Sequence, residues 1–481
     1  MKLDRLLCSK ELENLNSNPI ITDICSDSRL VRNGNLFLLL ERNTQLQEQY
    51  VKEAVSNGAS CVITPKEFRS DSSLLNIPIV RVDSVRKTLS QVSSKYYPKK
   101  PNNILAITGT NGKTSVTKLT EEIWQLMGIK SASIGTLGNS ADKMSSTLTT
   151  PEPISLHKQL NALASDGFHN LVIEASSHGL DQFRIDSLDI AGAAFTSFSR
   201  DHLDYHSSMD LYFRSKSRLF THLISQKGTV VINMINIPSR YYNFIDSIKA
   251  ENIITIDNKN ATISILDTKR GENNNIELQV DLSGNKMIVM TPFKASFQAI
   301  NSLIAGCMAT INTDISIPEA FASIERLSDV KGRLECVASI NNNNIYIDYA
   351  HTPNAMKSAL EAIKSITKNR LIIVFGAGGD RDKGKRRIMS DVADKYADLI
   401  IITDDNPRFE DPNLIRKQLM KQSKKYIEIA NREEAISYAI SLLSSQDNLV
   451  ICGKGHEEYM IYGKEKIFFS DHKIVEQTIK K

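Results

Sequence analysis

The residues best suited to bind a nucleotide form one short turn, Gly109-Thr110-Asn111-Gly112-Lys113-Thr114-Ser115. An apolar run at 104–108 precedes the turn and residues with helical spacing follow it, so it should join a strand to a helix. In that position backbone N–H groups and the helix dipole hold phosphate oxygens. Lys113 would reach the terminal phosphates, and Thr114 or Ser115 could coordinate Mg²⁺. We therefore predict an ATP site.

This turn matches the general phosphate loop incompletely, because Ile107 stands where the first glycine of G-x-x-x-x-G-K would be. The alternative is an ordinary turn between a strand and a helix, with Lys113 in solvent. The strand–turn–helix context favours the nucleotide site over that alternative.

Acidic and histidine side chains supply candidate metal ligands. Glu174 ends a predicted strand beside the turn, and carboxylate oxygens suit Mg²⁺. His202 lies among Asp201, Asp204 and His206, a cluster that is either a polar loop or a metal site. The residues alone leave both interpretations of the cluster open.

Composition points to a cytoplasmic enzyme. The 481 residues suggest about three domains. A net charge of only +4, spread along the chain, gives no case for binding nucleic acid or a membrane. The six cysteines are scattered without a C-x-x-C pair and indicate reduced thiols. No apolar run is long enough for a signal peptide or a membrane helix, so neither is expected.

Strands alternate with helices throughout, which predicts an α/β protein with mainly parallel sheets. We expect three domains, at 1–98, 99–331 and 332–481. The predicted strands lie at 36–40, 61–64, 79–82, 104–108, 170–174, 190–196, 229–233, 345–349, 370–375, 399–403 and 448–452. In the last domain the pattern suggests a doubly wound sheet, whose ligands lie beyond the carboxyl ends of the strands. Asparagine clusters at 273–275 and 341–344 should be exposed turns.

Several motifs in chain order resemble those of the Mur ligase family, which also includes folylpolyglutamate synthases. Besides the glycine turn they are Thr149-Thr150-Pro151, Glu174-Ala-Ser-Ser-His-Gly-Leu180, Asp201-His-Leu-Asp-Tyr-His206, Gly332-Arg333-Leu-Glu335, Asp348-Tyr-Ala-His-Thr-Pro353, Gly378-Gly-Asp-Arg-Asp382, Asp405-Asn-Pro-Arg408 and Gly453-Lys-Gly-His-Glu457. The resemblance implies a UDP-sugar-binding first domain, a central P-loop ATPase-like domain and a Rossmann-like third domain that binds an amino acid.

The resemblance also assigns metal ligands. It implies that Glu174 and His202 help to bind a second Mg²⁺, next to the ion held at Thr114. Lys216 lies in Tyr212-Phe-Arg-Ser-Lys-Ser-Arg-Leu-Phe220, which is similar to the family segment whose lysine is carbamylated. A carbamate can coordinate Mg²⁺, and its formation needs a neutral amine, which burial or a nearby positive charge favours by lowering the lysine pKa.

For the nucleotide, the family pattern implies contacts from Asn301, Arg333, Asp348 and His351. Asn354 departs from the pattern, because the family motif has aspartate there.

For the nucleotide-sugar substrate, Ser26-Asp-Ser28-Arg29 resembles the segment that binds the UDP-sugar, although an ordinary Asp/Ser turn is the alternative. The family's glycine-rich contact loop is replaced by residues 41–46, where Asn43, Thr44 and Gln45 are positional assignments. The residues that match contacts to the peptide substrate are Thr149, Thr150, Ser176, Gln182 and Arg184. The guanidinium of Arg184 suits a carboxylate or pyrophosphate oxygen.

Asp405-Asn406-Pro407-Arg408 discriminates between family members. In the family this loop reads the distal end of the incoming diamino acid, where meso-diaminopimelate carries a carboxylate and L-lysine does not. Arg408 offers a planar fork for that carboxylate. Arg381, Gly453 and Glu457 match the remaining contacts, and a bare Asn-Pro turn is the alternative for the loop itself.

The activity implied is an ATP-dependent amide ligation through an acyl-phosphate intermediate. The product would be UDP-MurNAc-L-Ala-D-Glu extended by meso-2,6-diaminopimelate, a peptidoglycan precursor, with Mg²⁺ as cofactor and a monomeric enzyme. The alternatives are a relative that adds L-lysine or D-Ala-D-Ala, a folylpolyglutamate synthase, or a P-loop switch or motor ATPase. An Asp-Asn-Pro-Arg loop argues against the other ligases, and amino-acid dependence of ATP turnover would exclude the ATPase.

Overall fold

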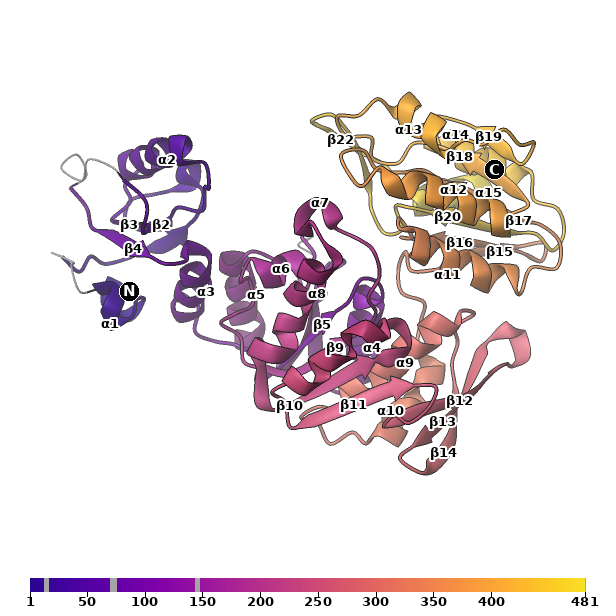
Figure 1. Ribbon diagram of the computed structural model, residues 1–481, viewed down its shortest axis with the longest axis horizontal. Coiled ribbons are helices and arrows are strands. Elements are labelled where there is room, and N and C mark those ends of the chain that lie inside the picture. The colour runs from indigo at the N-terminus through magenta and orange to yellow at the C-terminus, as the bar shows by residue number, and fades with distance from the viewer. Residues whose placement is uncertain (13–16, 70–75, 143–147, 481) are drawn as a thin grey trace.

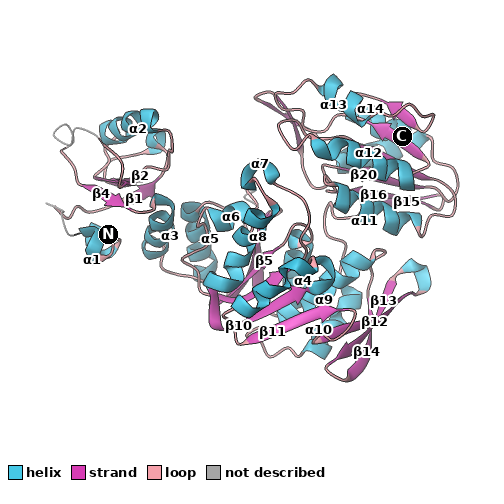
Figure 2. Ribbon diagram, in the orientation of Figure 1, coloured by secondary structure: helices cyan, strands magenta, loops and turns pink. Residues whose placement is uncertain are grey.

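The computed structural model describes residues 1–12, 17–69, 76–142 and 148–480. The chain folds into three α/β units, with the central unit between the other two (Figure 1). Helices cover the sheets of all three units (Figure 2). In the described ranges no helix is long and apolar enough to cross a bilayer.

The first unit is a four-stranded parallel sheet that confirms the three strands predicted there and adds one at its edge. In sheet order the strands are β1 (Asp23–Cys25), β2 (Asn35–Leu38), β3 (Cys61–Pro65) and β4 (Ile79–Val82), and the helices are α1 (Ser9–Leu12), α2 (Thr44–Ser56) and α3 (Val85–Tyr96). Beyond α3, Lys100 donates a 2.9 Å hydrogen bond to the Ser187 carbonyl of the central unit.

The central unit is built on a ten-stranded sheet. In sheet order its strands are β14 (Asn285–Met290), β13 (Ile276–Leu282), β12 (Ile263–Arg270), β11 (Asn252–Asp257), β10 (Ile224–Asn233), β9 (Ile190–Phe195), β5 (Asn103–Thr108), β8 (Asn170–Glu174), β6 (Ser131–Gly135) and β7 (Gly138–Asn139). The helices are α4 (Lys113–Leu126), α5 (Pro153–Ser165), α6 (Ser177–Asp181), α7 (Leu203–His206), α8 (Met209–Arg218), α9 (Ser296–Ala309) and α10 (Ile317–Ser323).

Parallel pairing of β6, β8, β5, β9 and β10 brings the carboxyl ends of these strands to one edge. At that edge β5 leads through the glycine turn into α4, as predicted. The apolar face of α4, with Val116, Leu119 and Ile123 fully buried, packs in one core with α9. The helix that carries the turn is therefore anchored over most of its length.

Two expectations need correction. The strands β12, β13 and β14, which pair antiparallel with one another, were not predicted. Five of the eight residues of β12 are exposed and give little apolar alternation, whereas the alternation of buried residues in β13 was overlooked. The asparagines at 341–344 are only partly a turn: Asn343 and Asn344 begin a strand. Asn343 is buried and accepts a 3.0 Å hydrogen bond from the Asp447 amide, so its polarity is satisfied inside the fold.

The third unit has six strands, parallel except at the β15 edge. Their order is β15 (Glu335–Ile340), β16 (Asn343–Asp348), β20 (Asn448–Cys452), β17 (Leu371–Phe375), β18 (Leu399–Ile402) and β19 (Tyr426–Glu428). The helices α11 (Pro353–Lys364), α12 (Gly384–Tyr396) and α13 (Pro412–Leu419) pack on one face, and α14 (Arg432–Ser441) and α15 (Asp471–Ile479) on the other. A hairpin of β21 (Tyr459–Tyr462) and β22 (Glu465–Phe468) completes it.

Candidate functional site

Two glycines of the turn occupy positions where a side chain would collide with neighbouring residues. Gly112 caps α4 with φ +86°, and a Cβ there would lie 2.8 Å from Asn301 Oδ1. Gly109 has φ +150°, and a Cβ on it would collide with Thr196 Oγ1. The Asn111 amide donates to Ser197 Oγ at 2.9 Å. The loop is thus held against β9 and the residues that follow this strand, with α4 starting directly behind it.

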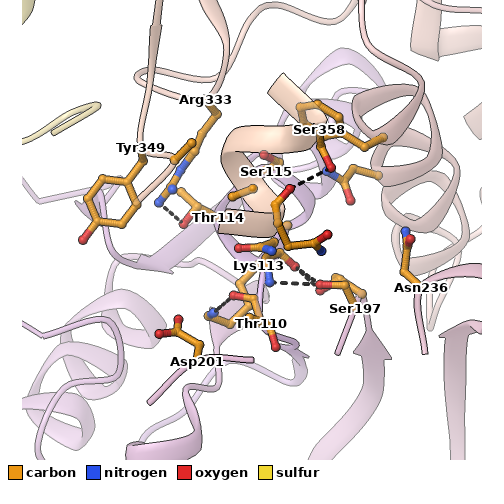
Figure 3. Close-up of a pocket in the computed structure, with 18 of the residues that line it drawn as sticks. Thr110, Lys113, Thr114, Ser115, Ser197, Asp201, Asn236, Arg333, Tyr349 and Ser358 are labelled. Atoms are coloured by element: carbon orange, nitrogen blue, oxygen red, sulfur yellow. Dashed lines mark hydrogen bonds between the residues drawn. The ribbon is translucent and has the colours of Figure 1, made fainter. Parts of the chain in front are cut away.

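A cavity of about 240 Å³ opens over this turn. Its walls come from the central unit and from the third unit, which contributes residues of the β16–α11 loop and of α11 (Figure 3). The predicted nucleotide contacts that line it are Thr110, Asn111, Gly112, Lys113, Thr114, Ser115, Asn301, Arg333, Asp348 and His351. Of the predicted turn, only Gly109 is not part of the lining; a Cβ on it would point at Thr196 and Ser197.

Lys113 folds back onto the turn. Its Nζ donates to the carbonyl oxygens of Gly109 at 2.9 Å and Thr110 at 3.0 Å. Burial lowers the pKa of the amine, opposed by the nearby carboxylates of Glu174 and Asp201. The side chain is therefore placed at the phosphate-binding turn and is held there by bonds that an incoming phosphate can replace.

Glu174 lies at the end of β8, opposite the start of α4. Its Oε2 accepts from the hydroxyls of Thr114 and Thr136, each at 3.1 Å, and its Oε1 accepts from the Thr136 amide at 2.8 Å. Arg333 Nη2 donates to Thr114 Oγ1 at 2.8 Å (Figure 3). A Cβ on Gly135 would collide with the carboxylate, so glycine is needed beside it. This set of oxygen atoms fits a Mg²⁺ ion, which prefers oxygen ligands.

Lys216 is buried, with 1% of its surface exposed, and donates to the Gly109 carbonyl at 2.7 Å. Its Nζ also lies 4.7 Å from the centre of the Tyr212 ring. Burial holds the pKa of this amine well below its usual range, and the positive charge of Lys113 lowers it further. The neutral amine that carbamylation requires is therefore favoured.

His202 lies in a group of aromatic and imidazole rings, one of them Tyr212 at 6.0 Å. The His202 ring centre is 5.0 Å from that of His178, which in turn contacts Tyr205 at 4.2 Å and His206 at 5.5 Å. Its Nε2 is 3.5 Å from Asp201 Oδ2. Burial lowers the pKa of His202 to about 3, with Asp201 opposing, so the imidazole is neutral and can accept a metal ion.

On the third-unit side, Asp348 ends β16 and accepts a 2.7 Å hydrogen bond from the Ala350 amide. Burial raises the pKa of its carboxyl to about 6, and Arg333 opposes the rise. The Arg333 guanidinium stacks on the Tyr349 ring, 4.4 Å from its centre. His351 Nδ1 lies 2.8 Å from the Tyr349 carbonyl, and Asn301 donates to Gln298 at 3.0 Å.

The predicted peptide contacts of the central unit form one hydrogen-bonded cluster. Thr150 Oγ1 lies 3.0 Å from Ser176 Oγ and accepts from the Ser176 amide at 2.9 Å. Arg184 donates to the Thr150 carbonyl at 2.6 Å and to Gln182 Oε1 at 2.7 Å. Thr149 joins through a 3.1 Å bond from the Thr136 hydroxyl. The cluster adjoins Glu174, the proposed metal ligand, through that same threonine.

Ser26 and Ser28 lie in the first unit. Ser28 is buried and donates to Glu53, and Asp27 caps the short turn by accepting from the Arg29 amide at 3.1 Å. Among the described residues, no hydrogen bond or ion pair joins the two serines to the Thr150 cluster. Contact between the first unit and that cluster runs instead through Arg86, which donates to Gln182 Oε1 at 3.3 Å.

A second cavity, of about 140 Å³, adjoins the first. The predicted diamino-acid contacts that line it are Arg381, Asp405, Asn406, Arg408, Gly453 and Glu457. Pro407 is buried in the same loop but is not part of the lining. The two cavities share Asp201, His202, Tyr349 and His351, so the sequence motifs of two domains meet at one place.

Arg408 adopts a left-handed backbone with φ +53°. Its Nη1 donates to the Gly379 carbonyl at 2.8 Å, and its backbone bonds to the β21–β22 hairpin through Ile461. Only half-buried, the guanidinium keeps donors available for a carboxylate. Asn406 donates to Glu457 Oε2 at 2.9 Å and so joins the two loops of this cavity.

Sequence reasoning missed several residues of the site, among them Thr136 and Lys385. Thr136 follows β6, a neighbour of β8 in the sheet, and a glycine–threonine pair at a strand end was the available signal. Lys385 lies on α12 and lines the second cavity. Burial lowers the pKa of its amine, and the carboxylates of Asp201 and Asp405 partly oppose this shift. No local pattern separates Lys385 from surface lysines.

The fold and the cavities define a three-unit α/β protein in which the cavity over the glycine turn adjoins a second cavity. Two family models match the chain: the Mur ligase middle domain over residues 107–309, and the Mur ligase, glutamate ligase domain over residues 332–455. The chain belongs to the Mur ligase family.

Relatives match over nearly the whole chain. The UDP-N-acetylmuramoyl-L-alanyl-D-glutamate–2,6-diaminopimelate ligase of Bradyrhizobium diazoefficiens is 40% identical over 462 residues, which cover 95% of this chain and 94% of the relative. The ligase of the same name from Rickettsia montanensis is 38% identical and covers 98% of both chains.

Solved structures agree with this assignment. One of a ligase with that same name has a TM-score of 0.67 at 29% identity, covering 96% of this chain and 95% of that chain. The MurF ligase from Thermotoga maritima in complex with ADP shares the fold at 16% identity, with a TM-score of 0.61 and coverage of 89% and 93%.

Proposed function

We propose that this protein is an ATP-dependent ligase that adds meso-2,6-diaminopimelate to UDP-MurNAc-L-Ala-D-Glu, a step in peptidoglycan precursor synthesis. The observation that carries the proposal is the adjacency of the two cavities. The nucleotide cavity contains the glycine turn, and the cavity next to it contains the Asp405–Arg408 loop. The names of the full-length relatives support the same substrates.

The reaction joins a carboxylate and an amine. A carboxylate of the dipeptide's D-Glu residue attacks the γ-phosphorus of ATP, ADP leaves, and an acyl phosphate forms. The diamino acid's neutral amine then attacks the acyl carbon, phosphate leaves with the bonding electron pair, and the nitrogen loses one proton as the amide forms. Both steps gather negative charge near the turn, where Lys113 and Arg333 supply positive charge. The cavity walls hold the reacting groups close together.

Thr114 and Glu174 would hold one Mg²⁺, and Glu174, His202 and a carbamylated Lys216 would hold a second. Bound Mg²⁺ neutralises phosphate charge and polarises the reacting phosphoryl group. The supporting observations are the oxygen set around Glu174, the neutral imidazole of His202 and the buried amine of Lys216.

Specificity for the diamino acid would come from Arg408, with Arg381, Asp405, Asn406, Gly453 and Glu457 completing the cavity. Thr149, Thr150, Ser176, Gln182 and Arg184 would bind the peptide, and Ser26 and Ser28 the UDP-sugar. We assign these roles to domains 1–98, 99–331 and 332–481, and expect a monomer that acts in the cytoplasm, where ATP is available.

Phosphate release from ATP tests the function. Release should require both UDP-MurNAc-L-Ala-D-Glu and meso-diaminopimelate, and the product should gain the mass of the diamino acid minus water. L-Lysine and D-Ala-D-Ala in place of meso-diaminopimelate should give little product, because a half-buried guanidinium left without a carboxylate is costly. ATP turnover that ignores both substrates would refute the ligase proposal, and equal use of L-lysine would refute its specificity.

A further inference from the structure

Two loops that start from different strands build the amino-acid cavity. The first, residues 404–408, follows β18, and the second, residues 453–457, follows β20. β17 lies between these strands in the sheet, so strand pairing does not join the loops. The 2.9 Å hydrogen bond from Asn406 to Glu457 joins later residues of the two loops, and a further contact joins the loops where they begin.

A buried ion pair lies directly behind both loops. Arg432, at the start of α14, donates two hydrogen bonds of 2.8 Å to the carboxylate of Asp471, at the start of α15. Both side chains are fully buried. The same guanidinium donates to the carbonyl of Cys452 at 3.0 Å and to that of Asp404 at 3.4 Å.

Each of these carbonyls belongs to the peptide bond just before a proposed substrate contact, Asp405 in one loop and Gly453 in the other. The two contacts lie against each other, because a Cβ on Gly453 would be 2.5 Å from Asp405 Oδ2. One guanidinium therefore holds the starting points of both loops where they meet.

We propose that Arg432, oriented by Asp471, is a positioning residue that sets the spacing of the two loops and so the recognition of the incoming diamino acid. This inference rests on the proposed function. The planar guanidinium can serve one carboxylate and two carbonyls at once, because its donors lie on three nitrogens, whereas all three donors of a lysine ammonium lie on one nitrogen. Stability alone does not need an ion pair here, because apolar residues of similar volume stabilise a core as well as a buried pair does.

The test compares Arg432→Lys, Arg432→Met and the double variant Arg432→Met/Asp471→Leu with the wild-type enzyme. In each, KM is measured separately for meso-diaminopimelate, ATP and UDP-MurNAc-L-Ala-D-Glu, together with kcat and the melting temperature. We expect KM for meso-diaminopimelate to rise roughly tenfold or more, with the other two KM values changed less than about twofold. The rise should persist in the double variant, which leaves no unpaired buried charge.

A control is the pair of Arg370 and Asp447, a partly exposed ion pair of the same unit whose nitrogen and oxygen atoms are 2.7 Å apart. Arg370 precedes β17 at the amino end of the sheet, away from both loops. Arg370→Lys should lower the melting temperature and leave all three KM values unchanged.

Two results would overturn the inference. One is an Arg432→Lys enzyme that melts as the wild type does and keeps its KM for meso-diaminopimelate. The other is a rise in all three KM values together, which indicates general loss of structure. If the wild-type enzyme ligates no diamino acid, both the proposed function and the inference are refuted. If the wild-type enzyme ligates normally, the KM values of the variants test the inference alone.

Discussion

Lys216 combines the features that a carbamate needs: a buried amine, a neighbouring cation and a position at the base of the phosphate turn. Lys216→Arg keeps a cation but cannot form a carbamate, so ligation should fall at least about 100-fold. In wild-type enzyme equilibrated with ¹³C-bicarbonate, a carbamate carbon signal should appear by NMR and should be absent from the variant. A Lys216→Arg enzyme that ligates at the normal rate would contradict the assignment.

Arg408 should act on one substrate only. Arg408→Ala removes a charge-assisted hydrogen bond to the distal carboxylate, so kcat/KM for meso-diaminopimelate should fall about 30-fold or more, with KM for ATP unchanged. Arg408→Lys should restore little, because a lysine lacks the bidentate fork. Arg387→Ala, at an exposed arginine of α12, is the control and should behave as the wild type. Equal losses at both arginines would remove Arg408 from the site.

Asp348 predicts a stability effect with a defined sign. Its pKa is raised from 3.8 to about 6 in the fold, so the charged form is disfavoured and the carboxylate destabilises the protein above pH 6. Asp348→Asn should therefore raise the free energy of unfolding by on the order of 1–3 kcal/mol at pH 8. The gain should shrink as pH falls below 6 and vanish only below about 3, where both states are protonated.

Melting temperatures of the two proteins at pH 8 and pH 4.5 measure this difference. The same substitution should slow ligation, because the carboxylate lines the nucleotide cavity. A gain in melting temperature of equal size at both pH values would contradict the electrostatic origin.

At the scale of elements, two glycines at opposite ends of α4 distinguish the effect of backbone strain from an effect on ATP binding. Gly112→Ala forces a φ of +86° on a residue with a side chain and places its Cβ 2.8 Å from Asn301 Oδ1. We expect a loss of about 1–2 kcal/mol of stability and a rise in KM for ATP of roughly tenfold or more. The control is Gly128→Ala after the same helix, with φ +75° but open space around it. Gly128→Ala should lose a similar amount of stability while KM for ATP stays normal. An equal rise in KM for ATP in Gly128→Ala would show that backbone strain, and not the Asn301 contact, causes the rise in Gly112→Ala.

Continuous apolar runs made the buried parallel strands predictable. Strands β5, β8 and β20 are buried over nearly their whole length and had the predicted bounds to within one residue. β12 could not be predicted, because its second half is solvent-exposed and rich in charge. Local sequence also gives only part of the site. A motif identified Glu174, but its hydrogen bonds to Thr136 depend on how β6 pairs with β8 in the sheet. Lys216 was identified only by resemblance, since nothing local shows that this lysine is buried.

For the whole molecule, the contact between the central and third units determines whether the two cavities adjoin. Arg200 and Asp382 form an ion pair of 3.0 Å across it, and Arg381 lies 3.5 Å from Asp204. Both pairs are partly exposed, so each contributes less than about 1 kcal/mol to stability. Their importance should lie in orienting the units.

A double-mutant cycle of Arg200→Gln and Asp382→Asn tests this orientation. Each variant should lower kcat/KM for meso-diaminopimelate by about two- to fivefold, and the double variant should be no worse than either single one. The melting temperature should stay within a few degrees. Additive losses in the double variant would show that the two residues act separately.

The carbonyl oxygen of Gly109 accepts from two lysines, Lys113 and Lys216. When ATP draws Lys113 away to its phosphates, that oxygen is left to Lys216 alone, and the positive charge beside the Lys216 amine moves. ATP and carbon dioxide are then thermodynamically linked ligands on the proposed chemistry. Whatever factor bicarbonate applies to the dissociation constant of ATP, ATP must apply to carbamate formation. On the proposed chemistry, one peptide oxygen would thus couple ATP binding to carbamate formation at Lys216.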